Sequence, residues 1–326
     1  FTRLRDRVVA ARQRGIYVSV MFFQGFSLDK TRGDKSKGNA WHGHPFNAAN
    51  NINGVDGNPS RDDSGNEVHT LAIPAVTRIQ ERYVRKVIDT VGDLDNVLWE
   101  IGNECHLDSV QWQYHMIRFI RKCEADQSMK HLIGMTGAPI ETEALMNSPA
   151  DWISPKGKLW LNKPPANTGQ KIVIVDSDHC DPWNHEPDWV WKNLLSGNHF
   201  ILMDGYMDYR LDSPQQPDPD WDSMRQAMGR ARAISEQIDL GRMHPMPRLA
   251  SSGYCLADPG EQYLVYRGAG TEAVAIQVPA GEYRVSWTDP TTGKQVAQSL
   301  ITLTDQRETL PSPAPGALLV MVERRK

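Results

Sequence analysis

The stretch Val97-Leu98-Trp99-Glu100-Ile101-Gly102-Asn103-Glu104 decides how the rest of this chain is understood. It is an apolar run of strand length that ends abruptly in a polar pair, and Cys105–Asp108 follow as a loop toward a helix. Enzymes built on parallel barrels place their reactive carboxylates at the carboxyl ends of buried strands. Glu104 is therefore a catalytic candidate and Asn103 a binding candidate. The alternative is a buried strand that simply ends in a solvated glutamate.

Strands and helices alternate from residue 1 to about residue 245, which predicts βαβ units and a parallel sheet. The strands are short and nearly all apolar, so we expect helices to cover both faces of the sheet. Strands are predicted at 16–22, 96–101, 131–135, 151–154, 171–176 and 199–204. Helices are predicted at 1–14, 71–92, 109–127, 142–148, 185–195 and 221–238.

Six strands with their helices predict a (β/α)8 TIM-type barrel that lacks its first two strands. The chain begins at Phe1, inside a pattern with apolar residues at 1, 4, 8 and 11 that is typical of one helix face. We therefore expect the missing strands upstream of Phe1. The alternative architecture is an open doubly wound sheet, although no strand is followed by the glycine-rich turn that binds a dinucleotide.

The character of the chain changes after residue 248. Short alternating strands separated by turn residues follow, at 262–266, 273–277, 282–287 and 317–322. This pattern predicts a small antiparallel β-sandwich. We therefore expect two domains, a partial barrel at 1–245 and a sandwich at 250–326.

Composition excludes several classes of protein. The 326 residues have a formal net charge of -4, which gives no reason to expect nucleic acid or an anionic membrane as a partner. The sequence contains no apolar run long enough to span a membrane. The four cysteines are scattered and form no Cys-x-x-Cys pair, so a zinc ribbon or a thioredoxin-like site is not expected. The oligomeric state cannot be read from the sequence.

A second group of polar residues follows the strand predicted at 171–176. Asp176, Asp178 and His179 lie together at its carboxyl end, and such groups are costly to bury without a purpose. Strand alternation would place Asp176 and Asp178 on the same face. We favour Asp178 as the nucleophile, because it lies further out, and give Asp176 a structural role. The alternative is a hydrogen-bonded loop that only orders the strand end.

The same cluster also allows a metal site. Oxygen and imidazole ligands at this density could bind calcium or zinc. Their spacing matches neither an EF-hand loop nor a helical His-Glu-x-x-His site, so no metal is expected. The potential ligands are Asp176, Asp178, His179, Asp181, His185 and Glu186.

Further residues are candidates for binding a sugar. The polar segment 24–70 is long enough to be functional, and it contains aromatic and amide side chains that suit a ring with many hydroxyl groups. An ordinary loop with Asn residues in left-handed turns is the alternative. Asp204 could equally be a helix N-cap. The complete set of binding candidates is Asn103, Trp41, His44, Asn50, His179, Trp183, Asp204 and Tyr206.

The strand that ends in Asn103-Glu104 resembles the acid/base strand of the clan A glycoside hydrolases, which have (β/α)8 barrels. Gly15–Phe23, Trp99–Glu104 and Asp176–His179 contribute most to the resemblance. Residues 254–293 resemble the collagen-binding-like sandwich found at the C-terminus of many bacterial members; the segments concerned are Tyr254–Ala257, Tyr263–Tyr266 and Trp287–Gly293.

This resemblance implies a bacterial glycosidase that is secreted or periplasmic, needs no cofactor and acts on a carbohydrate by a retaining mechanism. Glu104 would be its acid/base. The family's nucleophile is normally a glutamate at the end of the seventh strand, whereas this chain offers the shorter side chain of Asp178 there. The departure leaves two alternatives: a non-catalytic carbohydrate-binding relative, or a metal-dependent hydrolase that uses the Asp176–His179 cluster.

Overall fold

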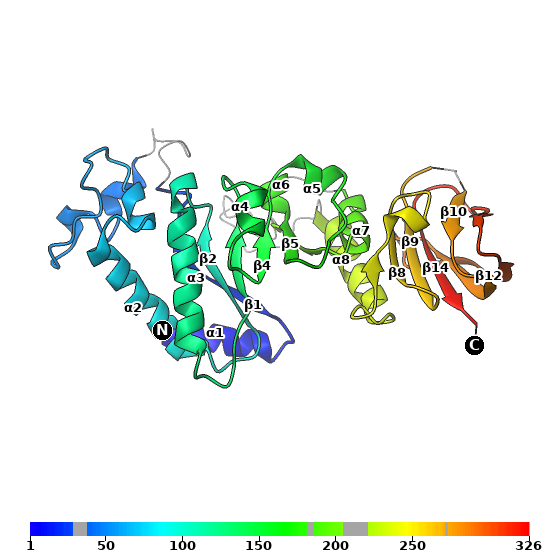
Figure 1. Ribbon diagram of the computed structural model, residues 1–326, viewed down its shortest axis with the longest axis horizontal. Helices are drawn as coiled ribbons and strands as arrows, with labels where there is room; N and C mark the ends of the chain where they lie inside the picture. Colours follow the sequence, from blue (N-terminus) through cyan, green and yellow to red (C-terminus); the bar gives the residue numbers. More distant parts are fainter. Residues whose placement is uncertain (29–37, 182–185, 205–220, 271–272, 326) are drawn as a thin grey trace. The chain divides into compact units, whose positions relative to one another are not determined.

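The computed structural model describes residues 1–28, 38–181, 186–204, 221–270 and 273–325. The chain forms two compact units, Phe1–Lys156 and Gly157–Lys326 (Figure 1). The predicted boundary at 245–250 separates the parallel and antiparallel parts of the chain by type of secondary structure. It stays a prediction.

In the first unit, four parallel strands lie side by side in chain order. They are β1 (Val18–Gln24), β2 (Val97–Asn103), β3 (Ile133–Thr136) and β4 (Trp152–Ser154). The register pairs Val20 with Trp99 and Gln24 with Asn103, so β1 and β2 end at the same edge. This edge brings the loop after β1 next to Glu104.

The helices of the first unit pack through apolar residues repeated at helical spacing. They are α1 (Thr2–Arg12), α2 (Pro74–Val91), α3 (Val110–Glu124) and α4 (Thr142–Met146). In α3 the buried Trp112, Met116 and Ile120 recur every fourth residue, which places them on one face. Figure 1 shows α3 running beside β2. Among the described residues, no helix is both long and apolar enough to cross a membrane.

The second unit begins with one further pair of parallel strands and their helices. The pair joins Asp176 to Ile201 at its carboxyl end. The elements are α5 (Lys158–Asn162), β5 (Ile172–Asp176), α6 (Ser177–Cys180), α7 (Asp188–Leu195), β6 (His199–Ile201) and α8 (Asp222–Ser235).

Antiparallel strands make up the rest of the second unit. One sheet has the order β12-β11-β14-β9-β8-β7, and a second consists of β10 and β13. Side chains from both sheets share one hydrophobic core, in which Tyr263, Tyr283 and Val320 are buried together with Ile276 and Leu310. The strands are β7 (His244–Pro245), β8 (Cys255–Asp258), β9 (Gln262–Arg267), β10 (Val274–Gln277), β11 (Gly281–Thr288), β12 (Gln295–Leu303), β13 (Arg307–Leu310) and β14 (Leu318–Arg324).

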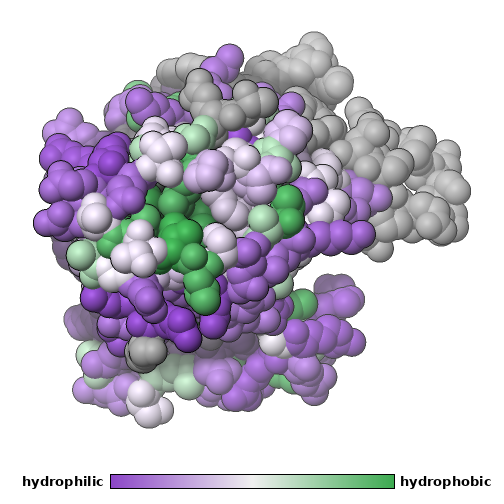
Figure 2. Space-filling view, turned by 90° about the vertical axis from the view of Figure 1, so that its right-hand side faces the viewer, coloured by the Kyte–Doolittle hydropathy of each residue, from purple (hydrophilic) through white to green (hydrophobic). Residues whose placement is uncertain are grey.

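Hydrophilic residues dominate the surface seen in Figure 2, with hydrophobic residues gathered in one area near the middle. Strand β12 lies at one end of its sheet beside β11, and its Val296 and Leu300 are exposed.

The predicted α/β class with parallel strands is confirmed, and all six predicted parallel strands and six predicted helices are present. The short helices α5 and α6 were missed. Closure into a complete (β/α)8 barrel and the two strands expected before Phe1 stay predictions.

Candidate active site

The carboxyl end of β2 is held against the loop that follows β1. The Asn103 side-chain amide donates to Oε1 of Gln24 at 2.8 Å, and the Asn103 carbonyl oxygen accepts from Gly25 N at 2.7 Å. Asn103 thus joins two strand ends through both its side chain and its backbone. Its position at the edge of the sheet is compatible with the predicted binding role, which stays a prediction.

Glu104 has a left-handed backbone, with φ at +45°. Such a conformation costs a non-glycine residue about 1–3 kcal/mol and persists only where the surroundings impose it. The residue comes directly after the last residue of β2, and its side chain is half-buried. Strained residues of this kind cluster at active sites. The strain therefore supports a functional rather than a purely structural carboxylate.

The packing of Cys105 explains why Glu104 keeps its left-handed backbone conformation. Its side chain is fully buried between two glycines. A Cβ atom at Gly25 would lie 2.4 Å from the Cys105 Cα, and a Cβ at Gly102 would lie 2.8 Å from its Sγ. Burial raises the pKa of the Cys105 thiol to about 12, so the group is a neutral packing element. The turn carrying Glu104 is therefore anchored by a close fit that any larger residue at Gly25 would disturb.

A second carboxylate, Glu100, lies on β2 and is only 8% exposed. Its Oε2 accepts from Ser19 Oγ at 2.9 Å and its Oε1 accepts from Thr136 Oγ1 at 2.5 Å. These hydroxyls come from β1 and β3, so Glu100 joins three neighbouring strands. Buried carboxylates require such partners. Glu100 thereby helps fix β2, the strand that Glu104 directly follows, and the sequence does not show these contacts with Ser19 and Thr136.

Two of the binding candidates in segment 24–70 build the segment itself. Trp41 is 3% exposed, packs with Leu28 and Val68, and stacks on His44 at 5.3 Å between ring centroids. The Asn50 side-chain amide donates to the carbonyl oxygens of His42 and His44, at 2.6 and 3.1 Å. Burial lowers the pKa of His44. These contacts favour a structural role for Trp41 and Asn50, and their contact with sugar stays a prediction.

The segment is anchored near Glu104 by buried imidazoles. His106 Nε2 lies 2.9 Å from the carbonyl oxygen of Asn66, and its ring stacks near that of His69 at 6.5 Å. In the part of the chain that the structure describes, Nδ1 of both histidines and Oδ1 of Asn66 are buried without a hydrogen-bond partner. Buried polar groups of this kind are usually satisfied by ordered water. No sequence motif marks either histidine as functional.

His69 should make the stability of the protein depend on pH. Burial, reinforced by the neighbouring His106 and His44, lowers the pKa of His69 from 6.5 to about 3. The His69 side chain therefore binds a proton near pH 6.5 in the unfolded chain, but it stays neutral at that pH in the folded chain. The free energy of unfolding should fall as pH drops from 6.5 toward 3, by up to ~1.4 kcal/mol per pH unit.

Urea unfolding between pH 7 and pH 5 measures this effect. We expect His69→Phe to remove most of the loss of stability that the wild type shows on acidification. His42→Gln is the matched control, because the His42 side chain is 64% exposed. An equal loss of stability in wild type and His69→Phe would contradict the assignment.

Strand β5 ends where it was predicted to end, but the conformation of the residues after it differs from the prediction. Strand β5 ends at Asp176, and Ser177–Cys180 form the helical turn α6. The expectation that strand alternation places Asp176 and Asp178 on one face is therefore wrong. The physical reason is that the Asp176 carboxylate caps the turn, with Oδ1 accepting from Asp178 N at 3.0 Å. Asp178 lies in the first turn of α6 and is half-buried.

Burial raises the pKa of Asp176, although the nearby His179 acts against this shift. The predicted structural role of Asp176 is consistent with its capping hydrogen bond. Ser177 is buried, and its Oγ accepts from Met203 N at 2.8 Å, which joins the ends of β5 and β6. The backbone of His179 accepts from Gly157 N at 2.9 Å, and its side chain is half-buried.

The remaining sugar-binding candidates in the second unit are Asp204, Trp183 and Tyr206. Asp204 forms a bidentate ion pair with Arg225 of α8, at 2.6 and 2.9 Å. This pairing joins Asp204 to α8 and leaves sugar binding by Asp204 a prediction. Trp183 and Tyr206 lie outside the described residues.

Solved structures with the same fold are glycoside hydrolases by name. No protein-family profile and no curated protein matches the chain. A glycoside hydrolase family 5 protein from Bacteroides vulgatus matches with a TM-score of 0.55 and 13% identity, over 77% of this chain and 68% of the other. A protein described as a glycoside hydrolase matches with a TM-score of 0.57 and 9% identity, over 99% of this chain and 89% of the other.

A further Bacteroides vulgatus protein, proposed to be a glycoside hydrolase, gives a TM-score of 0.65 at 14% identity. The match covers 99% of this chain and 63% of the other, so the chain spans less than two thirds of that protein's length. At these identities the likeness shows the fold alone. The fold is a TIM-like α/β fold that these solved structures share.

Proposed function

We propose that this protein is a retaining glycoside hydrolase that cleaves O-glycosidic bonds in a polysaccharide or oligosaccharide. Glu104 is the acid/base and Asp178 is the nucleophile. The observation that supports this most strongly is the left-handed backbone of Glu104 at the end of β2, directly after Asn103. The fold is also the one that the named glycoside hydrolases share.

In the first step, a neutral Glu104 donates its proton to the leaving glycosidic oxygen while a carboxylate oxygen of Asp178 attacks the anomeric carbon. The carbon–oxygen bond breaks, an alcohol leaves, and a glycosyl ester of Asp178 forms. In the second step, the Glu104 carboxylate takes a proton from water, whose oxygen displaces Asp178 from the anomeric carbon. Both groups return to their starting states, and the mechanism requires the two carboxyl groups to be about 5–5.5 Å apart.

Asp176 and Asn103 support this chemistry without forming bonds to the sugar ring carbon. We assign Asp176 to positioning, because its carboxylate holds the backbone N–H of Asp178. The Asn103 amide would bind a sugar hydroxyl beside Glu104. His44, His179 and Asp204 remain candidates for further sugar contacts. We expect the natural substrate to be a glycan outside the cytoplasm.

Hydrolysis of a panel of soluble polysaccharides, followed by release of reducing ends, tests the proposal. We expect activity on at least one polysaccharide, unchanged by a chelator such as EDTA. Loss of activity with the chelator would instead favour the metal-dependent hydrolase. Binding of a polysaccharide without any product would favour the non-catalytic carbohydrate-binding relative.

A further inference from the structure

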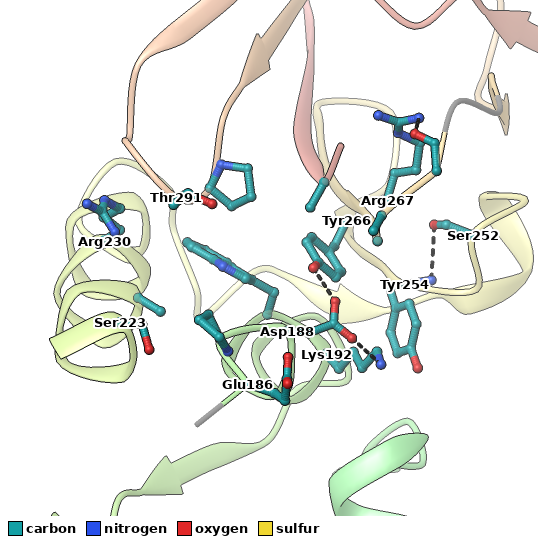
Figure 3. Close-up of a pocket in the computed structure, with 18 of the residues that line it drawn as sticks. Glu186, Asp188, Lys192, Ser223, Arg230, Ser252, Tyr254, Tyr266, Arg267 and Thr291 are labelled. Atoms are coloured by element: carbon teal, nitrogen blue, oxygen red, sulfur yellow. Dashed lines mark hydrogen bonds and ion pairs between the residues drawn. The ribbon is translucent and has the colours of Figure 1, made fainter. Parts of the chain in front are cut away.

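The second unit contains a pocket of about 1030 Å³, and Asp176 and Asp178 are not among the described residues that line it (Figure 3). Helices α7 and α8 form one side, and residues of the antiparallel part form the other. The volume is at the upper end of the range for pockets that hold small ligands. The proposed active site therefore does not account for this pocket.

The floor of the pocket is held by contacts between α7 and β9. The Tyr266 hydroxyl donates to Asp188 Oδ1, and the Lys192 ammonium group forms an ion pair with Asp188 Oδ2 (Figure 3). Trp191 stacks on Tyr266 with ring centroids 6.4 Å apart and an interplanar angle of 25°. Burial, together with Asp188, raises the pKa of Tyr266, so the phenol is a neutral donor. These contacts give the pocket a preformed floor.

One face of α8 forms a polar wall. Ser223, Gln226 and Arg230 all line the pocket, at the spacing i, i+3 and i+7 that places them on one face. A wall of this kind suits a ligand rich in oxygen, because an apolar ligand would strip water from these side chains without replacing their hydrogen bonds. Ser252 and Thr291, from the antiparallel part, also line the pocket, and Figure 3 shows Thr291 on the same side as Arg230 and Ser252 on the opposite side.

Arg230 distinguishes this wall from the rest of α8. Its Nη2 donates to Gln226 Oε1 at 3.2 Å, and among the described residues no carboxylate forms an ion pair with it. Arg225 and Arg232 of the same helix do have carboxylate partners. A guanidinium group binds a planar carboxylate through two parallel hydrogen bonds. Arg230 is therefore the group in this pocket best suited to receive one.

The charges that line the pocket limit the charge of its ligand. Arg230, Lys192 and Arg267 are cationic, and Glu186 and Asp188 are anionic. A ligand with several negative charges, such as a phosphate ester, would meet the two carboxylates. A ligand with one carboxylate per sugar unit matches this nearly balanced lining better.

We propose that this pocket is a second glycan-binding site that takes a uronic acid unit, with Arg230 on its carboxylate and with Ser223 and Gln226 on its hydroxyls. The inference rests on the proposed function only in taking a glycan as the natural substrate. The site would hold an acidic polysaccharide away from the bond being cleaved. It should therefore lower KM for a polymer and leave kcat unchanged.

Isothermal titration calorimetry of the full chain with tetragalacturonate and with an alginate tetrasaccharide tests the site. We expect one of these uronates to bind, the neutral cellotetraose not to bind, and Arg230→Gln to weaken uronate binding at least tenfold. Arg232→Gln is the matched control on the same helix, and its affinity should equal that of the wild type. Ser223→Tyr, which places a bulky ring on the polar wall beside Arg230, should also lose binding while its melting temperature is unchanged.

Binding should survive in Glu104→Gln, which separates this site from the proposed active site. If Glu104→Gln retains binding but no glycan is hydrolysed by the wild type, the catalytic proposal fails and the pocket proposal stands. If neither uronate binds, or if Arg230→Gln binds as well as the wild type, the pocket is a water-filled gap and the proposal is wrong.

Discussion

Replacing Glu104 with alanine is expected to lower the rate of glycan hydrolysis by about 10²–10⁴-fold, the usual contribution of a general acid/base. The loss follows because no other group would then protonate the leaving oxygen or activate water. Sodium azide should restore the rate on an aryl glycoside with a good leaving group, since azide attacks the glycosyl ester without needing a base. The product should then be a glycosyl azide.

Glu141→Ala is the matched control, because the Glu141 side chain is 74% exposed and pairs only with Lys156 among the described contacts. Its activity should equal that of the wild type. A folded Glu104→Ala protein that hydrolyses glycan at the wild-type rate, or that azide does not accelerate, would rule out the acid/base assignment.

Asp178→Asn is expected to have the largest effect, a loss of more than about 10⁴-fold in kcat, because the variant cannot form the glycosyl ester. Asp176→Asn is an informative comparison. Asparagine caps a helical turn nearly as well as aspartate, so this variant should keep the turn α6 and lose about tenfold or less. The reverse order of losses would identify Asp176 as the nucleophile.

Strand periodicity could predict much of the fold. Apolar runs such as Ile172–Asp176 fixed the strand positions, because a buried parallel strand must be apolar on both faces. The predicted strand 171–176 ends at Asp176 as β5 does, but the pattern could not show that a helical turn follows directly, since that depends on a carboxylate that accepts the backbone N–H of Asp178. A capping residue directly after an apolar run was the available indication, whereas the prediction extended strand alternation past it to Asp178.

Part of the candidate site could also be predicted from the sequence. The Asn103-Glu104 pair at a strand end could be recognised in the sequence, whereas the residues that hold this pair in place could not. Glu100 and Cys105 lie on or next to the same strand, and their roles depend on Ser19, Thr136 and Gly25 from distant segments. The packing of Trp41 with Leu28 and Val68 could not be predicted either, because an aromatic residue in a polar loop can belong to a small hydrophobic core as easily as to a sugar-stacking surface.

Covalent trapping tests the central claim most directly. A 2-deoxy-2-fluoroglycosyl fluoride of the sugar that the enzyme cleaves slows both steps but retains a good leaving group, so the glycosyl ester should accumulate. Mass spectrometry of the intact chain, followed by peptide mapping, is expected to locate one fluorosugar on Asp178. Turnover without any adduct, or an adduct on another residue, would contradict the account.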